Sequence, residues 1–153
     1  MNLDKIKNAL SGVNKQFKGK VVQIGLPSGI NYEDGTSVAY VATIHEFGAP
    51  EQNIPPRPFF TPTIAAHKKQ WSGMIGKGVV QVRNGNLHAD QVLDAVGTVA
   101  VADLRDTING MSSPALQPAT IAAKGFSELL VDTGLMIASI QSKVGTAGGD
   151  FTA

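Results

Sequence analysis

Glycine and proline divide this sequence into short segments, and the apolar residues within several of them recur with helical spacing. The 153 residues include 17 glycines and 8 prolines. Glycine often ends a helix in a left-handed conformation, and proline lacks the amide donor needed to continue one. A chain of this length can bury one hydrophobic core and is too short for two full-sized domains. We therefore expect a single domain assembled from several separate elements.

The first segment, residues 2–18, is predicted to form an amphipathic helix that Gly19 ends. Residues 20–26 (KVVQIGL) are rich in β-branched side chains and predict a strand, which Pro27 closes. Residues 28–36 (SGINYEDGT) are dense in residues that favour turns and are expected to form a mobile loop. The apolar face of the helix is expected to hold Leu3, Ile6, Leu10, Val13 and Phe17.

Residues 37–47 favour a second helix, with Thr36 or Ser37 as its N-cap and Gly48 just past its end. The β-branched side chains of this segment keep a strand as the alternative. The expected apolar stripe, with one residue in every three, is Val38, Val41, Ile44 and Phe47.

Four prolines in residues 49–58 predict a stiff, extended spacer. Its role would be to orient Phe59 and Phe60, which follow it directly. The next helix is expected to open with Thr61 as N-cap and Pro62 at the first helical position, where a missing amide proton does no harm.

Two helices are expected to follow one another in the middle of the chain. The one beginning at Pro62 should bend or fray in its second half, because each glycine is about 1 kcal/mol less favourable than alanine inside a helix. Residues 90–109 form the longest predicted helix, and Gly110 ends it. The interrupting glycines are Gly73, Gly76 and Gly78.

The C-terminal third is more irregular. Residues 112–118 predict a linker, and residues 119–124 a helical turn. A last short helix near Gly134 and a strand around residues 139–145 are expected to follow. Residues 146–153 combine glycine with little apolar content and predict a flexible tail.

Together these segments predict an α+β fold. Several helices would pack on a small antiparallel sheet, with a long glycine-rich loop and a flexible C-terminal tail. Residues 1–145 would form the single domain.

Charge is sparse and unevenly placed. Charged residues make up 16% of the chain against about 25% in an average soluble protein, while hydrophobic residues make up 42%. This balance favours a surface partly covered by partners, and a net charge of +1 disfavours tight binding to nucleic acid. Residues 1–20 carry +4 and residues 21–66 carry −3, so identical subunits could pair head to tail. The alternative is that these lysines are simply solvated.

The tested motifs for chemistry all fail. The chain has no cysteine, which excludes disulfides, thiolate metal sites and a cysteine nucleophile. His45 and Glu46 begin a zinc-protease motif, but its second histidine would fall on Ala49. A phosphate loop over residues 71–78 fails because Trp71 and Gly78 occupy required positions, and there is no GxSxG elbow. The sequence therefore predicts no catalytic residue, no cofactor, no metal site and no enzymatic activity.

No membrane association is expected either. No run of hydrophobic residues is longer than five, residues 38–42, against roughly 20 needed to span a bilayer. The N-terminal segment mixes apolar and charged residues and shows no export signal.

Two stretches resemble the tail-completion or neck (head–tail joining) proteins of tailed phages, a family that overlaps the Mu-like virion morphogenesis proteins. Residues 38–60 (VAYVATIHEFGAPEQNIPPRPFF) are similar to that family's "hEFG … iPaRPFl" pattern. Residues 116–124 (LQPATIAAK), 130–135 (LVDTGL) and 139–140 (SI) resemble its "L.p.T...K … LvdTG.L..SI" pattern. The two matches keep the family's order.

The resemblance implies a structural virion protein without catalytic activity. It would form a ring of about six or twelve copies at the head–tail junction, joining tail to head around the channel through which DNA passes. Its partners would be other copies of itself, the neighbouring neck or connector proteins, and the tail-tube or tail-terminator proteins. It would reside in the host cytoplasm during assembly and in the virion afterwards. The alternatives are a tail assembly factor or chaperone absent from the particle, and a small virion-associated hydrolase.

The motif residues also receive expected roles. Glu46 is a candidate partner for Arg57, and the two phenylalanines would anchor the proline spacer either in the core or in a neighbouring subunit. Asp132 and Thr133 would cap the last short helix. The predicted subunit or neck contacts are Lys5, Lys7, Glu46, Phe47, Arg57, Phe59 and Phe60.

Overall fold

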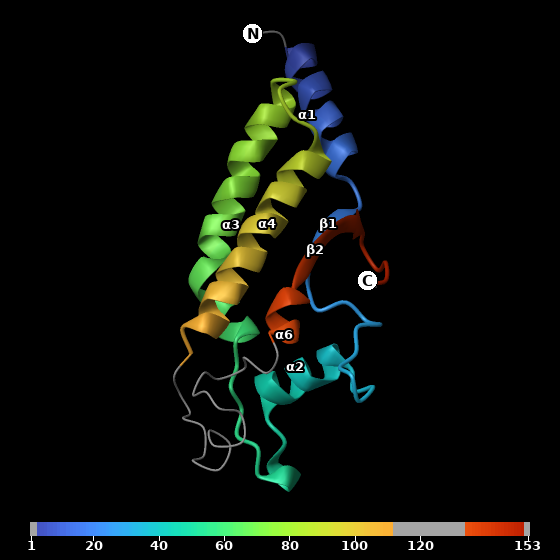
Figure 1. Ribbon diagram of the computed structural model, residues 1–153. Helices are drawn as coiled ribbons and strands as arrows, with labels where there is room; N and C mark the ends of the chain where they lie inside the picture. The colour runs from blue at the N-terminus through green and yellow to red at the C-terminus, as the bar shows by residue number, and fades with distance from the viewer. Residues whose placement is uncertain (1–2, 112–133, 152–153) are drawn as a thin grey trace.

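The computed structural model describes residues 3–111 and 134–151. These residues form the predicted α+β fold, with five α-helices and a two-stranded antiparallel sheet packed against helix α4. The molecule is elongated, with α1 at one end and α2 near the other (Figure 1). Expectations for residues 112–133, including the helical turn, the caps at Asp132 and Thr133 and most of the second phage-like stretch, lie outside the described residues.

The N-terminal elements lie close to their predicted bounds. Helix α1 spans Leu3–Phe17, and strand β1 spans Lys20–Gly25. No residue of α1 is buried, so this helix is attached to the rest of the molecule only along part of its surface. Lys20 anchors the start of β1 by a salt bridge of 2.7 Å to Asp90 at the start of α4.

Residues 37–47, for which the sequence favoured a helix and left a strand as the alternative, form a helix. Helix α2 spans Val38–Phe47, and the Ser37 hydroxyl accepts a hydrogen bond from the Tyr40 amide as its N-cap. Gly48 ends the helix with φ at 75°. A Cβ at this position would lie 2.9 Å from the Ile54 carbonyl oxygen, so both the backbone conformation and the close packing require glycine. A short 3₁₀ turn, η1 (Pro50–Gln52), follows, and Ala49 pairs with Ile54 across it. The prediction of an extended spacer is therefore wrong for residues 49–54.

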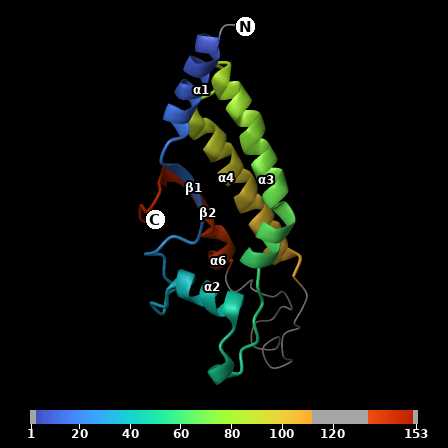
Figure 2. The same cartoon turned by 180° about the vertical axis from the view of Figure 1, so that it is seen from behind.

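Helices α3 (Phe60–Arg83) and α4 (Ala89–Asn109) form a long hairpin (Figures 1 and 2). α3 is the longer of the two and continues through all three of its glycines, so the predicted fraying does not interrupt it. One of these glycines has a packing reason: a Cβ on Gly78 would lie 2.2 Å from Cγ1 of Val92 on α4. The hairpin helices therefore pack more closely here than any side chain would allow.

The two strands come from opposite ends of the sequence. β2 (Gln141–Thr146) pairs antiparallel with β1, in a register that places Lys20 opposite Thr146 and Gly25 opposite Gln141. The sheet lies against α4, where Gly97 leaves room for Ser142 and Val22.

The short helix α6 (Leu135–Ala138) precedes β2, as predicted, and Gly134 is its N-cap. Arg105 on α4 ties this region down by donating hydrogen bonds to the carbonyl oxygens of Ile137 and Ile140.

The segment after β2 folds back over β1. The Ala147 amide donates to the Gly19 carbonyl, the Gln23 side chain donates to the Gly149 carbonyl, and the Ser28 amide donates to the Phe151 carbonyl. Its flexibility was predicted from the sequence and stays a prediction, but these three bonds give the segment a defined path as far as residue 151.

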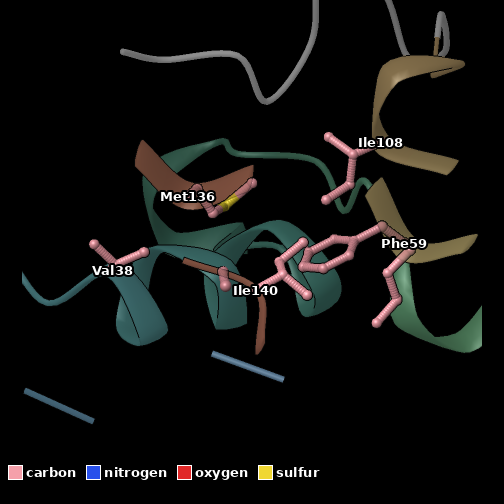
Figure 3. Close-up of a cluster of buried hydrophobic side chains, with 7 residues drawn as sticks. Val38, Phe59, Ile108, Met136 and Ile140 are labelled. Carbon is pink, nitrogen blue, oxygen red and sulfur yellow. The ribbon is translucent and has the colours of Figure 1, made fainter. Parts of the chain in front are cut away.

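One hydrophobic core joins the elements at the α2 end of the hairpin. Its buried side chains come from α2, the start of α3, α4, α6 and the residue before β2, and several of them converge in Figure 3. They are Val38, Ala42, Phe59, Leu104, Ile108, Met136 and Ile140. Among the described helices, none is long and apolar enough to cross a membrane.

Candidate interaction surface

The Glu46 carboxylate, near the end of α2, caps the N-terminus of α3. Its Oε2 accepts hydrogen bonds from the Phe59 and Phe60 amides at 2.8 and 2.9 Å. Its Oε1 accepts from the Thr61 amide at 3.0 Å and the Thr61 hydroxyl at 2.6 Å. These amides are among the donors that a helix leaves unpaired at its start, so one buried side chain satisfies them from another helix.

The environment of Glu46 favours its charged form. Burial raises the pKa of this carboxyl, but the hydrogen bonds from the Thr61 hydroxyl and the three amides outweigh burial, and the pKa lies below the ordinary value. The positive end of the α3 dipole acts in the same direction.

The predicted pair between Glu46 and Arg57 is wrong. The four donors at the start of α3 occupy the carboxylate, and Arg57 forms no salt bridge with any described residue. Arg57 is instead held through its backbone, whose amide donates to the His45 carbonyl oxygen at 2.6 Å. The motif residues Glu46 and Arg57 do lie in segments that contact each other, but the carboxylate accepts its hydrogen bonds from other donors.

Glu46 also shifts the start of α3. The sequence predicted Thr61 as N-cap and Pro62 as the first helical residue, whereas the helix begins at Phe60 and Phe59 is the cap residue, without a side-chain cap of its own. Because the cap comes from α2, no local capping side chain is needed.

The two phenylalanines after the proline spacer have different surroundings. Phe59 is fully buried in the core, which confirms the core-packing alternative for this residue (Figure 3). Phe60 is half-buried against the core, with its ring centroid 4.8 Å from that of Phe59. The proline spacer is therefore anchored within the same molecule.

Phe47 projects from the end of α2 with 73% of its surface exposed, although the sequence placed it on the same stripe as Val38. The physical reason is the spacing of three. A helix turns about 100° per residue, so nine residues bring Phe47 about 180° away from Val38. The buried face of α2 consists of Val38, Ala42 and Glu46, spaced by four.

The exposed face of α2 is a surface that the sequence reasoning missed. Tyr40 is 58% exposed, and with Thr43 and Phe47 it follows the helical spacing i, i+3, i+7. That spacing was the available signal. We call Tyr40, Thr43 and Phe47 the α2 face. Beside it lies a shallow groove of about 320 Å³, lined by Leu26, Ala39, Ala42, Thr43, Glu46, Phe47, Phe60 and Thr61.

At the other end of the molecule, α1 exposes part of its predicted apolar stripe. Leu3 and Leu10 are 63% and 60% exposed, and Ile6 is 36% exposed. We call these three residues the α1 face. Lys5 and Lys7 are exposed on the same turns and form no salt bridge with any described residue.

The predicted contact residues therefore fall into separate groups. Lys5 and Lys7 lie at the α1 end, and Phe47 lies on the α2 face. Glu46 and Phe59 are buried and serve the fold. Residues 3–111 and 134–151 contain no group of three or more histidine, aspartate or glutamate side chains that could hold a metal ion. Comparisons with protein-family models, with curated proteins and with solved structures find no match to this chain. The resemblance to phage neck proteins thus stays a prediction from the sequence motifs.

Proposed function

We propose that this chain is a structural protein of a tailed-phage virion, which assembles as a ring at the head–tail junction and joins tail to head. In this role it is a tail-completion or neck component with no catalytic activity, and the ring surrounds the channel for DNA. Its other partners are the neighbouring connector and tail proteins.

One observation carries the proposal. Glu46 joins the segment with the phage-like motif, residues 38–60, to the start of α3, and this segment also exposes Tyr40 and Phe47 to solvent. A motif whose buried side chains maintain the fold, and which also exposes two large aromatic side chains, suits a subunit that contacts its neighbours. The low charged content of the chain supports the same role.

Glu46 has no support as a catalytic group. Both of its oxygens accept hydrogen bonds from the start of α3. The hydrolase alternative therefore lacks its best candidate carboxylate.

The proposal is tested on gradient-purified particles of the phage that encodes the chain. Quantitative mass spectrometry should find a fixed copy number, about six or twelve per particle, the ring size that the resemblance to neck proteins implies. Antibody labelling should place the chain at the junction of head and tail. Absence from mature particles would overturn the proposal in favour of the assembly-factor alternative, whose bound partner could then be sought in infected cells.

A further inference from the structure

Two apolar helix faces lie uncovered at opposite ends of the molecule. The α1 face (Leu3, Ile6, Leu10) and the α2 face (Tyr40, Thr43, Phe47) are exposed. The helices that carry them lie toward opposite ends of the α3–α4 hairpin in both views (Figures 1 and 2). Large apolar side chains grouped on one helix face are typical of contact surfaces. Neither face can reach the other within one molecule.

The two faces match in geometry. Each consists of residues at i, i+3 and i+7, which form one continuous ridge along two turns of helix. Ridges of this kind pack between the side chains of a facing helix. The groove beside Phe47 and Phe60 offers additional space next to the α2 face.

The net charges around the two faces are opposite, although Asp4 lies on the turns of the α1 face and Arg57 at the α2 end. Lys5 and Lys7 accompany the α1 face, and Arg83 lies beside it. At the α2 end, Glu51 lies in the turn that follows the helix, and Glu33 is exposed in the loop before it. The two lysines, Arg83 and the two glutamates form no salt bridge with a described residue.

We propose that the α1 face of one copy packs on the α2 face of a second copy, in a head-to-tail contact between identical chains. A symmetric α1–α1 contact would bring lysines together, and an α2–α2 contact would bring carboxylates together, so charge favours the mixed pairing. A heterologous contact of this kind repeats from copy to copy and closes into a ring when its rotation allows. The inference deepens the proposed function and rests on it only for closure into a ring.

The absence of cysteine makes a clean cross-linking test possible. Leu10→Cys and Phe47→Cys are made as separate full-length variants, one of them carrying a mass tag, and a short bismaleimide is the probe. The mixture should give cross-linked heterodimers in several times the yield of either variant alone. Ile64→Cys, another exposed aliphatic position, is the matched control and should give only background when mixed with Phe47→Cys. Circular dichroism verifies that each variant is folded.

Two results would overturn the contact. One is a mixed yield no higher than that of the Ile64→Cys control. The other is cross-linking of Leu10→Cys with itself that equals or exceeds the mixed yield, because that indicates a symmetric contact.

Charge reversal gives a second readout that leaves the apolar faces intact. Lys7→Glu and Glu51→Lys should each weaken self-association, measured by sedimentation equilibrium, by about two- to fivefold at low salt. Mixing the two variants should restore association, since the new carboxylate on α1 of one variant then meets the new lysine at the α2 end of the other. Loss of the effect near 1 M salt is expected because the Debye length falls to about 3 Å. No recovery in the mixture would count against the pairing.

The experiments distinguish failure of the α1–α2 contact from failure of the proposed virion role. A chain found at the head–tail junction without α1–α2 cross-links keeps the proposed function and loses this contact. A chain that cross-links as expected but is missing from particles keeps the contact and loses the virion role.

Discussion

Glu46 caps the start of α3, where the helix has no capping side chain of its own. Phe59 has no capping oxygen in its side chain, and Pro62 has no amide proton to satisfy. The carboxylate supplies acceptors for three consecutive amides and a hydroxyl, and thereby fixes α2 to α3 by a charge-assisted contact. Glu46 is a charged residue, a type that usually lies on the surface, but here it is buried and part of the fold.

Glu46→Gln should lower the free energy of unfolding by about 1–3 kcal/mol at neutral pH. The amide group keeps one acceptor oxygen but turns an NH₂ donor toward amides that are themselves donors. Urea unfolding measures the change. Glu51→Gln, which alters an exposed glutamate five residues along the chain, is the matched control and should change stability by less than about 0.5 kcal/mol.

At low pH, the difference in unfolding free energy between the wild type and Glu46→Gln should disappear. Because the pKa of Glu46 is lower in the folded protein than its ordinary value of 4.5, the charged form stabilises the fold above that value. This contribution is lost as the pH falls below 4.5 through the lowered folded pKa. Urea titrations repeated at decreasing pH should show the wild type approaching Glu46→Gln. A gap that stays constant with pH would contradict the assignment.

Phe59 and Phe47 both belong to the phage-like motif, but Phe59 is buried and Phe47 is exposed. Phe59→Ala should destabilise the monomer by about 3–5 kcal/mol because it empties a fully buried position. Phe47→Ala, at an exposed position, should leave monomer stability within about 0.5 kcal/mol. Thermal unfolding at low protein concentration compares the two, with Phe59→Leu as the milder change if Phe59→Ala does not fold. Equal losses would contradict this division.

At the scale of elements, periodicity and end signals in the sequence carried most of the prediction. The predicted helix at residues 90–109 is Ala89–Asn109 in the structure, and the predicted strand at residues 20–26 is Lys20–Gly25. Contacts between elements could not be read in the same way. The cap at Glu46 joins residues 13 to 15 positions apart, and no local pattern specifies which donors a distant carboxylate will meet.

For the candidate surface, too, features that depend on one helix could be predicted, whereas features that depend on contacts between elements could not. Exposure of Lys5 and Lys7 follows from the charges of an amphipathic helix. Only the C-terminal part of the α1 stripe, Val13 and Phe17, is partly covered, and none of it is buried. How far this cover extends depends on where α3 and α4 end, which the sequence of α1 does not encode. Phe47 was placed on the wrong face because a spacing of three was treated as a full helical turn.

The glycines of α3 separate into two kinds, which substitution can distinguish. Gly78→Ala should destabilise the protein by about 1–3 kcal/mol, since its new methyl group would overlap Val92. Gly73→Ala meets nothing within 4 Å and should stabilise the helix by up to about 1 kcal/mol. Chemical denaturation of both variants tests the pair.

A compensating change provides the control for this close approach. Adding Val92→Ala to Gly78→Ala removes the overlapping side chain and should recover part of the loss, beyond what the two single changes predict by addition. Simple additivity would show that the hairpin does not pack through Gly78.

At the scale of the whole molecule, stability is expected to be uneven. α1 has no buried residue, whereas α4 has eight. Hydrogen exchange at low protein concentration should therefore be fast in α1 and slow in α4, because an isolated helix of about 15 residues is marginal in water. Raising the concentration should slow exchange in α1 and α2 together if copies associate through them. Equal protection of α1 and α4 in the dilute protein would contradict the expectation.

The pairing of β1 with β2 also has a consequence for synthesis on the ribosome. β1, α2 and the α3–α4 hairpin emerge before the strand and the two core side chains, Met136 and Ile140, that complete them. The contacts between α3 and α4 lie within residues 60–109, so the hairpin can form early, but the sheet and the core must wait until β2 has left the exit tunnel. During translation the nascent chain therefore leaves β1 without its partner strand and the core open, and unpaired strands and exposed apolar side chains of this kind promote aggregation.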